Sequence, residues 1–274
     1  MFELGSGEAA VLLAVVTVCG ALAGFLAGLL GVGGGIVIVP ALYWVLGEAG
    51  IANEIRMQVA VATSLATIVP TSFLSARAHR AKGSFDEAML KRWIAPGMIG
   101  AAFGTLFAAS VDGRLLAGVF GVVALIVAAQ MIAFPGGLAL RPGLPGRAGQ
   151  TAMAASIGGL SAVMGIGGGT LAVPTLTLFS YPIRQAVGTS AGLGLFVAIP
   201  ATLGFMIGGW GRVDLPPLSL GCVSLPIAAA VLATMLPCVG RGAKLAHRIS
   251  QPALRRAFGI VLAVVGLRML SALF

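Results

Sequence analysis

Long apolar runs separated by short polar stretches dominate the sequence. A helix that crosses a bilayer core of about 30 Å needs roughly 20 apolar residues, and eight runs reach or approach that length. Two further runs are shorter, because twelve residues at about 1.5 Å each span only about 18 Å. We therefore predict an all-α, polytopic membrane protein with about ten transmembrane segments, two of them half-helices. The long segments are expected at 9–30, 57–76, 93–111, 114–134, 148–164, 185–209, 215–238 and 252–274, and the short ones at 36–47 and 170–181.

The composition indicates that lipid is the solvent of this chain. Hydrophobic residues make up 58% and charged residues 9% of its 274 residues, whereas soluble domains have about 45–50% apolar and about 25% charged residues. No stretch between the runs is long enough for a soluble domain, so residues 1–274 are expected to form a single transmembrane domain. The first run is too long for the core of a signal peptide, and acidic Glu3 and Glu8 precede it.

The distribution of Lys and Arg indicates how many segments cross the membrane. If all ten cross, thirteen of the seventeen basic residues lie on one side, three lie on the other, and Arg268 lies within the last segment. If the short segments do not cross, the basic loops 77–92 and 241–256 fall on opposite sides. Cytoplasmic loops are enriched in Lys and Arg, so we predict ten crossings, cytoplasmic basic loops and both termini outside. The thirteen are Arg77, Arg80, Lys82, Lys91, Arg92, Arg141, Arg147, Arg184, Arg241, Lys244, Arg248, Arg255 and Arg256, and the three are Arg56, Arg114 and Arg212.

The chain contains an internal repeat. The stretch from Gly31 to Pro40, GVGGGIVIVP, recurs from Gly165 to Pro174 as GIGGGTLAVP, with six of ten positions identical. Downstream, the AVATS stretch ending in Ser64 matches the AVGTS stretch ending in Ser190, and Phe120-Gly121 matches Phe258-Gly259. The halves, 9–134 and 148–274, hold five segments each, so the second half would enter the membrane from the opposite side. Such inverted repeats are typical of secondary transporters, with a site near the midplane between the halves.

Each glycine cluster is expected to form an extended turn at membrane depth, followed by a helix that begins near Pro40 or Pro174. Glycine permits positive φ and close approach, and proline suits the first turn of a helix. Free N–H groups and the positive end of the helix dipole would then favour an anion. The alternative is that the glycines let helices pack closely. The substrate-binding residues predicted here are Gly33, Gly34, Gly35, Pro40, Gly167, Gly168, Gly169, Thr170 and Pro174.

Hydroxyl and basic side chains extend this candidate site. Thr63-Ser64 and Thr189-Ser190 lie near the starts of the segments that follow the half-helices, where their hydroxyls either complete the shell of an oxyanion or bond to helix carbonyls. Arg77 and Arg184 lie at ends of these segments and are weaker candidates for a cytoplasmic entrance. They serve either to attract anions or to set topology and contact lipid.

Several function classes are not predicted. The eight acidic residues avoid the middles of the spans, and His79 and His247 are expected to be solvated, so a carboxylate or histidine relay for cations is absent. Three cysteines without a CxxC pair suggest neither a disulfide framework nor a metal site. No cofactor is expected, and the net charge of +9 reflects topology rather than nucleic-acid binding.

An enzyme is also not predicted. The stretch from Gly188 to Gly192, GTSAG, matches the nucleophile elbow G-x-S-x-G, but that motif needs a strand–turn–helix setting and a nearby histidine. The phosphate-binding motif of ATP-driven pumps does not occur in the chain. An ion-coupled carrier and an uncoupled anion channel or facilitator both stay open.

The paired GxGGG-x4-P motifs, each followed by a Thr-Ser segment, resemble the TauE/SafE family of sulfite exporters, also called the toluene sulfonate uptake permease family. The resemblance extends over nearly the whole chain. It implies transport of small sulfur-containing anions, such as sulfite, thiosulfate or sulfoacetate, across the cytoplasmic (inner) membrane of a bacterium. It also implies that the glycines and prolines of both motifs line the path, where the first has Ile36 and the second Thr170. The expected partners are this anion and the lipid bilayer, and a homo-oligomer is left open.

Overall fold

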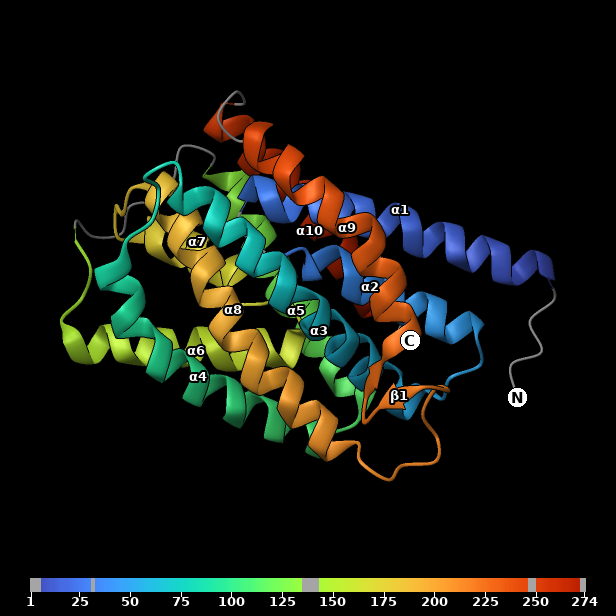
Figure 1. Cartoon of the computed structure of the whole chain (residues 1–274). Coiled ribbons are helices and arrows are strands. Elements are labelled where there is room, and N and C mark those ends of the chain that lie inside the picture. The colour runs from blue at the N-terminus through green and yellow to red at the C-terminus, as the bar shows by residue number, and fades with distance from the viewer. Residues whose placement is uncertain (1–5, 31–32, 135–142, 246–249, 272–274) are drawn as a thin grey trace.

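A computed structural model describes residues 6–30, 33–134, 143–245 and 250–271 (Figure 1). These ranges hold ten α-helices and a two-stranded antiparallel hairpin directly before α9, so the expectation of a helical protein is confirmed. The elements are α1 (Ser6–Leu30), α2 (Gly35–Glu48), α3 (Asn53–Arg80), α4 (Glu87–Ser110), α5 (Gly113–Ala133), α6 (Arg147–Met164), α7 (Gly169–Leu178), α8 (Ile183–Gly208), β1 (Ser219–Leu220), β2 (Val223–Ser224), α9 (Leu225–Leu245) and α10 (Gln251–Ser271).

Each predicted segment corresponds to one helix, but some bounds are wrong. The segment expected at 215–238 begins as a loop and a hairpin, and its helix starts only at Leu225. Two adjacent prolines, Pro216 and Pro217, cannot donate helical hydrogen bonds, and Gly221 turns the hairpin with a φ of 53°. The basic loop expected at 77–92 is mostly helical, since α3 continues to Arg80 and α4 begins at Glu87.

Among the described residues, five helices are long and apolar enough to cross a membrane: α3, α4, α5, α8 and the Leu225–Gly242 part of α9. Shorter apolar helical stretches lie in α1, α2 and α7. Fewer helices thus meet this criterion than the eight long segments expected. Large apolar side chains such as Phe103 and Ile207 are 69% and 74% exposed, which suits a lipid-facing surface. The described residues form a multi-pass membrane protein.

Glycines bring α1 and α9 together backbone to backbone. A Cβ placed on Gly24 would lie 2.2 Å from the Met235 carbonyl oxygen, and one on Gly242 would lie 2.0 Å from the Phe25 carbonyl oxygen. Only glycine leaves room for such approach, which is a common way for helices to pack in membranes. Residue numbers rise together across this interface, so α1 and α9 run parallel.

The pair formed by α4 and α6 is built in the same way. A Cβ on Gly100 would lie 2.0 Å from the Ala155 carbonyl oxygen, and one on Gly104 would lie 2.3 Å from the Gly159 carbonyl oxygen. Numbers again rise together, so these two helices are also parallel.

Two further pairs are antiparallel. In α3 and α8, the Cβ position of Gly194 lies 3.0 Å from the Ser72 hydroxyl, and that of Gly188 lies 3.2 Å from the His79 Cβ. The residue numbers of the contacting pairs rise along α3 while they fall along α8, so the two helices run antiparallel. The same reversal relates α5 to α10, where the close pairs are Gly121 with Leu270 and Gly259 with Ile132.

The central helix α3 gives the bundle two ends, which we name the Asn53 end and the Arg80 end after its first and last residues. It contacts α2, α5, α8 and α9 (Figure 1). A Cβ on Gly113 would lie 2.7 Å from the Asn53 carbonyl oxygen, so α5 starts at the Asn53 end. The hydroxyl of Ser75 donates to the Ala27 carbonyl of α1, so α1 ends at the Arg80 end.

Candidate functional site

The two glycine clusters turn the chain between a long helix and a short one. In the first, Gly33 and Gly34 have φ of 78° and 76° immediately before α2. In the second, Gly165 and Gly167 have φ of 69° and 65° between α6 and α7. Side chains with a Cβ rarely adopt such angles, so the backbone requires glycine at these four positions.

The short helices begin earlier than expected. They start at Gly35 and Gly169, so the expectation of a start near Pro40 or Pro174 is wrong. The glycines join the helix instead of preceding it, and each proline lies inside the helix. A proline cannot donate to the carbonyl four residues before it, and membrane helices tolerate this loss where protein covers the backbone.

Gly168 corrects a second expectation. Its φ of −60° and ψ of −22° are those of a right-handed helix, so positive φ does not explain this glycine. A Cβ here would lie 3.1 Å from the Leu193 Cγ of α8. Close packing, rather than backbone conformation, is therefore the constraint at this position.

The two turns touch each other inside the bundle. A Cβ on Gly35 would lie 2.3 Å from the Gly165 carbonyl oxygen. The Ile68 Cγ2 of α3 packs against both turns, at 3.2 Å from the Cβ position of Gly33 and 3.0 Å from that of Gly167. Motifs far apart in sequence thus meet at one buried place, which we call the glycine crossing and define as Gly33–Gly35 together with Gly165–Gly169.

The short helices leave the glycine crossing in opposite directions. α2 ends at the Asn53 end, where Arg56 of α3 donates to the Ile51 carbonyl just beyond α2 at 2.8 and 3.1 Å. α7 ends at the Arg80 end, where the Tyr181 hydroxyl donates to the Asp86 carboxylate. Both helix N-termini, which carry partial positive charge, therefore face the crossing. It contains no acidic side chain, so the local field favours an anion.

The two threonines of the Thr-Ser pairs make equivalent contacts across the halves. The Thr63 hydroxyl accepts a hydrogen bond from the Ser224 N–H at 3.1 Å, directly before α9. The Thr189 hydroxyl accepts one from the Asp86 N–H at 3.0 Å, directly before α4. Each threonine therefore ties the start of a long helix in the other half to the core, one near each end of the bundle.

The two serines differ. The Ser64 hydroxyl donates to the Gly165 carbonyl at 2.8 Å and so holds the second glycine turn. Within the described residues, the buried Ser190 hydroxyl has no hydrogen-bond partner. The repeat equivalent of Gly165 is Gly31, which lies outside the described residues. A buried hydroxyl without a partner is costly, and Ser190 is therefore the better placed of the two to bind a ligand.

Ser72 was missed by sequence reasoning. It is buried on α3, with its hydroxyl oxygen 3.5 Å from the Cβ position of Gly33 and 3.0 Å from that of Gly194 on α8. The repeat could not have found it, because the equivalent residue in the second half is Ala198. Thr170, the second residue of α7, is also buried at the crossing.

The predicted entrance residues lie at the Arg80 end. Arg77 is exposed near the end of α3, and Arg184 is exposed in the first turn of α8. His79, which was expected to be solvated, is 3% exposed, with Nε2 3.3 Å from the Gly28 carbonyl oxygen. That expectation is wrong because α3 extends past the predicted segment and packs this turn against α1. His247 lies outside the described residues.

A polar contact closes the Arg80 end beside these residues. The carboxylate of Asp86 accepts hydrogen bonds from the Tyr181 hydroxyl and from the Met89 N–H at the start of α4. Burial alone would raise the pKa of Asp86, but these hydrogen bonds and one from the Ala88 backbone outweigh it and lower the pKa below its ordinary value. Burial and the hydrogen bond to Asp86 raise the pKa of Tyr181.

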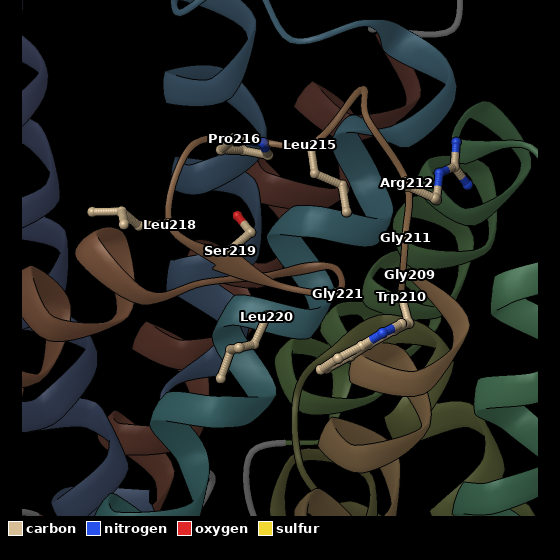
Figure 2. Close-up of a pocket in the computed structure, with 10 residues that line it drawn as sticks. All are labelled: Gly209, Trp210, Gly211, Arg212, Leu215, Pro216, Leu218, Ser219, Leu220 and Gly221. Carbon is tan, nitrogen blue, oxygen red and sulfur yellow. The ribbon is translucent and has the colours of Figure 1, made fainter.

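A small pocket at the Asn53 end lies apart from this site. It has a volume of about 250 Å³ between the end of α8 and the β1–β2 hairpin (Figure 2). Its one charged side chain, Arg212, is engaged by Asp214 through hydrogen bonds of 3.0 and 2.7 Å. The pocket therefore offers no free charge, and the glycine crossing is the better candidate site.

The structure does not place Ser190 in a nucleophile elbow. Residues 188–192 lie within α8, which Pro182 and a short loop precede, rather than at a strand–turn–helix junction. The G-x-S-x-G match is therefore a helical coincidence of small residues.

Comparison with known proteins agrees with these features. Residues 16–269 match the family described as sulfite exporter TauE/SafE. A probable membrane transporter protein of Haemophilus influenzae is 33% identical over 255 residues, which cover 91% of this chain and 95% of that protein. One of Methanocaldococcus jannaschii is 28% identical and covers 96% and 97%. No solved structure matches the chain. Because the family match spans almost the whole sequence, this chain is a membrane transporter of the TauE/SafE sulfite exporter family.

Proposed function

We propose that this transporter moves small sulfur-containing anions, such as sulfite or an organosulfonate, across the bacterial cytoplasmic membrane, and that the glycine crossing is its substrate site. The observation that carries the proposal is the meeting of two oppositely directed helix N-termini at a buried place without acidic side chains. Each hydrogen bond to a charged group contributes about 1.5–3 kcal/mol. A few N–H groups of α2 and α7 would therefore suffice to hold a small oxyanion.

The proposed topology has ten crossings, which helix directions support. Antiparallel α3 and α8 fit an odd number of chain reversals between them, which supports counting the short α7 as a crossing. Parallel α1 and α9 fit an even number, which supports counting the short α2 as well. The basic Arg80 end would then face the cytoplasm and both termini the outside.

The proposed inverted repeat is supported by the pairing of helices. In the repeat, α1 corresponds to α6, α4 to α9, α3 to α8 and α5 to α10. If the halves 9–134 and 148–274 are exchanged, the α1–α9 pair becomes the α6–α4 pair, and the α3–α8 and α5–α10 pairs stay the same. The same exchange turns the Thr63–Ser224 hydrogen bond into the Thr189–Asp86 hydrogen bond. The two halves would therefore form one transmembrane domain, with the crossing between them.

The proposed mechanism is alternating access. The Thr63–Ser224 bond closes the Asn53 side of the crossing, and the Thr189–Asp86 bond closes the Arg80 side. Breaking one while keeping the other would open the site to one side at a time. Ser190, Thr170 and Ser72 would supply hydroxyls to the anion, while Ser64 holds the turn and Arg77 and Arg184 raise the local concentration of anions at the cytoplasmic mouth.

Ser190→Ala tests the site, with Thr202→Val as its matched control. Both remove a buried hydroxyl of α8 that has no hydrogen-bond partner within the described residues. Loss of one bond to an anion, at about 1.5–3 kcal/mol, should raise the half-saturation concentration for sulfite roughly 10- to 150-fold in proteoliposomes. Thr202→Val should leave it unchanged. Equal behaviour of the two variants would remove Ser190 from the site.

Counterflow separates a carrier from a channel. Preloading the vesicles with unlabelled sulfite should accelerate uptake of labelled sulfite if access alternates, and should not do so through an open pore. Imposed Na⁺ and pH gradients in the same vesicles then identify the coupling ion.

A further inference from the structure

A larger pocket opens between α2 and α10, away from the glycine crossing. Its volume is about 850 Å³. α2 lines it from Val37 to Glu48, α10 lines it from Val264 to Ser271, and Arg56 of α3 contributes at the Asn53 end. Both lining helices end at the Asn53 end, because α2 leads into α3 and α10 runs antiparallel to α5. The pocket is therefore apolar toward the middle of the bundle and charged toward this end.

Arg268 is the residue of this pocket that needs an explanation. Its side chain is exposed and lies in the last turn of α10, directly after the apolar stretch from Ile260 to Leu267, where a long basic side chain can reach the head-group region. Across the described ranges, its guanidinium forms neither a hydrogen bond nor an ion pair. Arg56 adds a second guanidinium, fixed over the Tyr43 ring at 5.4 Å. With Glu48, the pocket carries two positive charges and one negative charge.

The position that the repeat relates to Arg268 shows how the corresponding helices pack where a side chain joins them. Counting from the matched Phe-Gly pairs, Arg268 of α10 corresponds to Gln130 of α5. The Gln130 amide donates to the Pro174 carbonyl of α7 at 3.4 Å and thereby ties α5 to the short helix. At the repeat-related place, Arg268 of α10 and Pro40 of α2 instead line the same open space. The exchange of an amide for an arginine thus accompanies an open, positively charged pocket.

The pocket opens through the side of the bundle. Val264 and Trp44 both line it, and they are 56% and 48% exposed. Lipid chains surround this surface in a membrane protein, and tryptophan is typical of the membrane–water interface. A water-soluble anion would not reach the pocket from this direction, whereas a lipid of the adjacent leaflet would.

We propose that a phospholipid with an anionic head group occupies this pocket. Its phosphate binds Arg268, with Arg56 adding charge at the same end, because guanidinium and phosphate form bidentate, charge-assisted hydrogen bonds. One acyl chain lies along Val37, Ala41 and Val264 toward the middle of the bundle. The ligand therefore contacts α2, the short helix that starts at the glycine crossing. This site depends on the membrane location of the chain, not on the identity of the transported anion.

Native mass spectrometry of protein released from nanodiscs tests the proposal. Nanodiscs contain equal parts of phosphatidylglycerol and phosphatidylcholine, and lipid retained by the protein is counted. Wild type should retain phosphatidylglycerol preferentially, and Arg268→Gln should weaken that retention about tenfold or more. Arg114→Gln is the matched control, since it removes an exposed arginine at the same end outside the pocket. Its retention should equal that of wild type.

A second variant fills the pocket and keeps the charge. Ala41→Phe should abolish retention of phosphatidylglycerol while Arg268 remains, so the result does not depend on the folding of one variant. Equal losses in the Arg114 and Arg268 variants, or equal retention of both lipids by wild type, would overturn the proposal. Dodecanesulfonate, a free amphipathic anion, is tested as the alternative ligand. If it binds at Arg268 while phosphatidylglycerol does not, the pocket belongs to a free amphipathic anion and the lipid assignment is wrong.

Discussion

Gly34 and Gly168 occupy equivalent positions in the two glycine turns, yet their backbones and neighbours differ. Gly34 has a φ of 76°, and a Cβ on it would lie 2.6 Å from the Ala23 carbonyl oxygen of α1. Gly168 has a φ of −60°, and its Cβ would meet a leucine side chain at 3.1 Å. The repeat preserves the place where the turns meet, but not the conformation of each residue. The two sides of the proposed anion site are therefore chemically and mechanically unequal.

The largest expected difference is in the tolerance of these two glycines to alanine. Gly34→Ala combines positive φ, which costs about 1–2 kcal/mol in an L-residue, with contact to backbone atoms that cannot move away. We expect its free energy of unfolding to fall by more than about 2 kcal/mol. Gly168→Ala should change it by less than about 1 kcal/mol, because its backbone is already helical and the Leu193 side chain can move. Thermal unfolding in detergent measures both.

Gly50→Ala separates the two causes in Gly34. Gly50 has a φ of 78°, and no atom lies within 4 Å of its Cβ position, so this variant reports the cost of backbone conformation alone. If Gly34→Ala is no more destabilising than Gly50→Ala, the contact with α1 does not contribute to the loss of unfolding free energy. Equal effects at Gly34 and Gly168 would contradict the inequality of the turns.

The next effect concerns the two ends of the bundle. Thr63→Val should expose the Ser224 amide to exchange, and Thr189→Val should expose the Asp86 amide, because each variant removes the acceptor of that N–H. An unsatisfied buried donor costs about 1–3 kcal/mol, which corresponds to roughly 5- to 150-fold faster exchange. Hydrogen–deuterium exchange with peptide resolution distinguishes the ends. Faster exchange at both ends in either variant would show that the two closures are not independent.

Asp86 adds a pH dependence to one end only. Its folded pKa is lowered, so the ionised carboxylate stabilises the protein above the ordinary aspartate pKa, and this stability is lost as the pH falls through the lowered value. The difference in melting temperature between wild type and Asp86→Asn should therefore shrink from pH 7 toward pH 3. The equivalent position at the Asn53 end is Ser224, which does not titrate in this range. A constant difference would mean that folding does not lower the pKa of Asp86.

The smallest effect is expected for Gln130→Ala. The bond from Gln130 to the Pro174 carbonyl is long, at 3.4 Å, so its loss should cost less than about 1 kcal/mol. Thermal unfolding at pH 7 measures this cost. A loss of several kcal/mol would show that α7 depends on α5 far more than this single contact suggests.

Apolar periodicity was enough to locate every helix, because membrane spans are long and their ends are marked by charge. It failed where local chemistry decides a boundary, as at Pro216 and Pro217 before α9. The short apolar runs began within one residue of α2 and α7, whereas the helix starts inferred from Pro40 and Pro174 were wrong. Apolar periodicity also misjudged His79, because burial at a helix end depends on a neighbour, α1, that is distant in sequence.

The candidate site was predicted only as far as the repeat reaches. Two copies of one motif indicated that Gly33–Gly35 and Gly167–Gly169 lie near each other. The structure packs Gly35 against Gly165 and sets Gly33 and Gly167 on either side of Ile68. The partners of Thr63 and Thr189 are backbone N–H groups, which carry no sequence signal. Ser72 lacks a repeat counterpart. Arg268 was seen in the sequence only as a charge inside a span, and its meaning depends on the pocket beside it.

The packing of α1 against α9 has a consequence for how the chain is made. Gly24 accommodates the backbone of Met235, which is synthesised 211 positions later. At about 5–20 residues per second, α1 stays in the membrane for roughly 10–40 s before this neighbour emerges from the ribosome. During that interval its glycine groove must be covered by lipid or by the insertion machinery. Biogenesis of this protein therefore includes a late docking step, in which α9 packs against the much earlier α1.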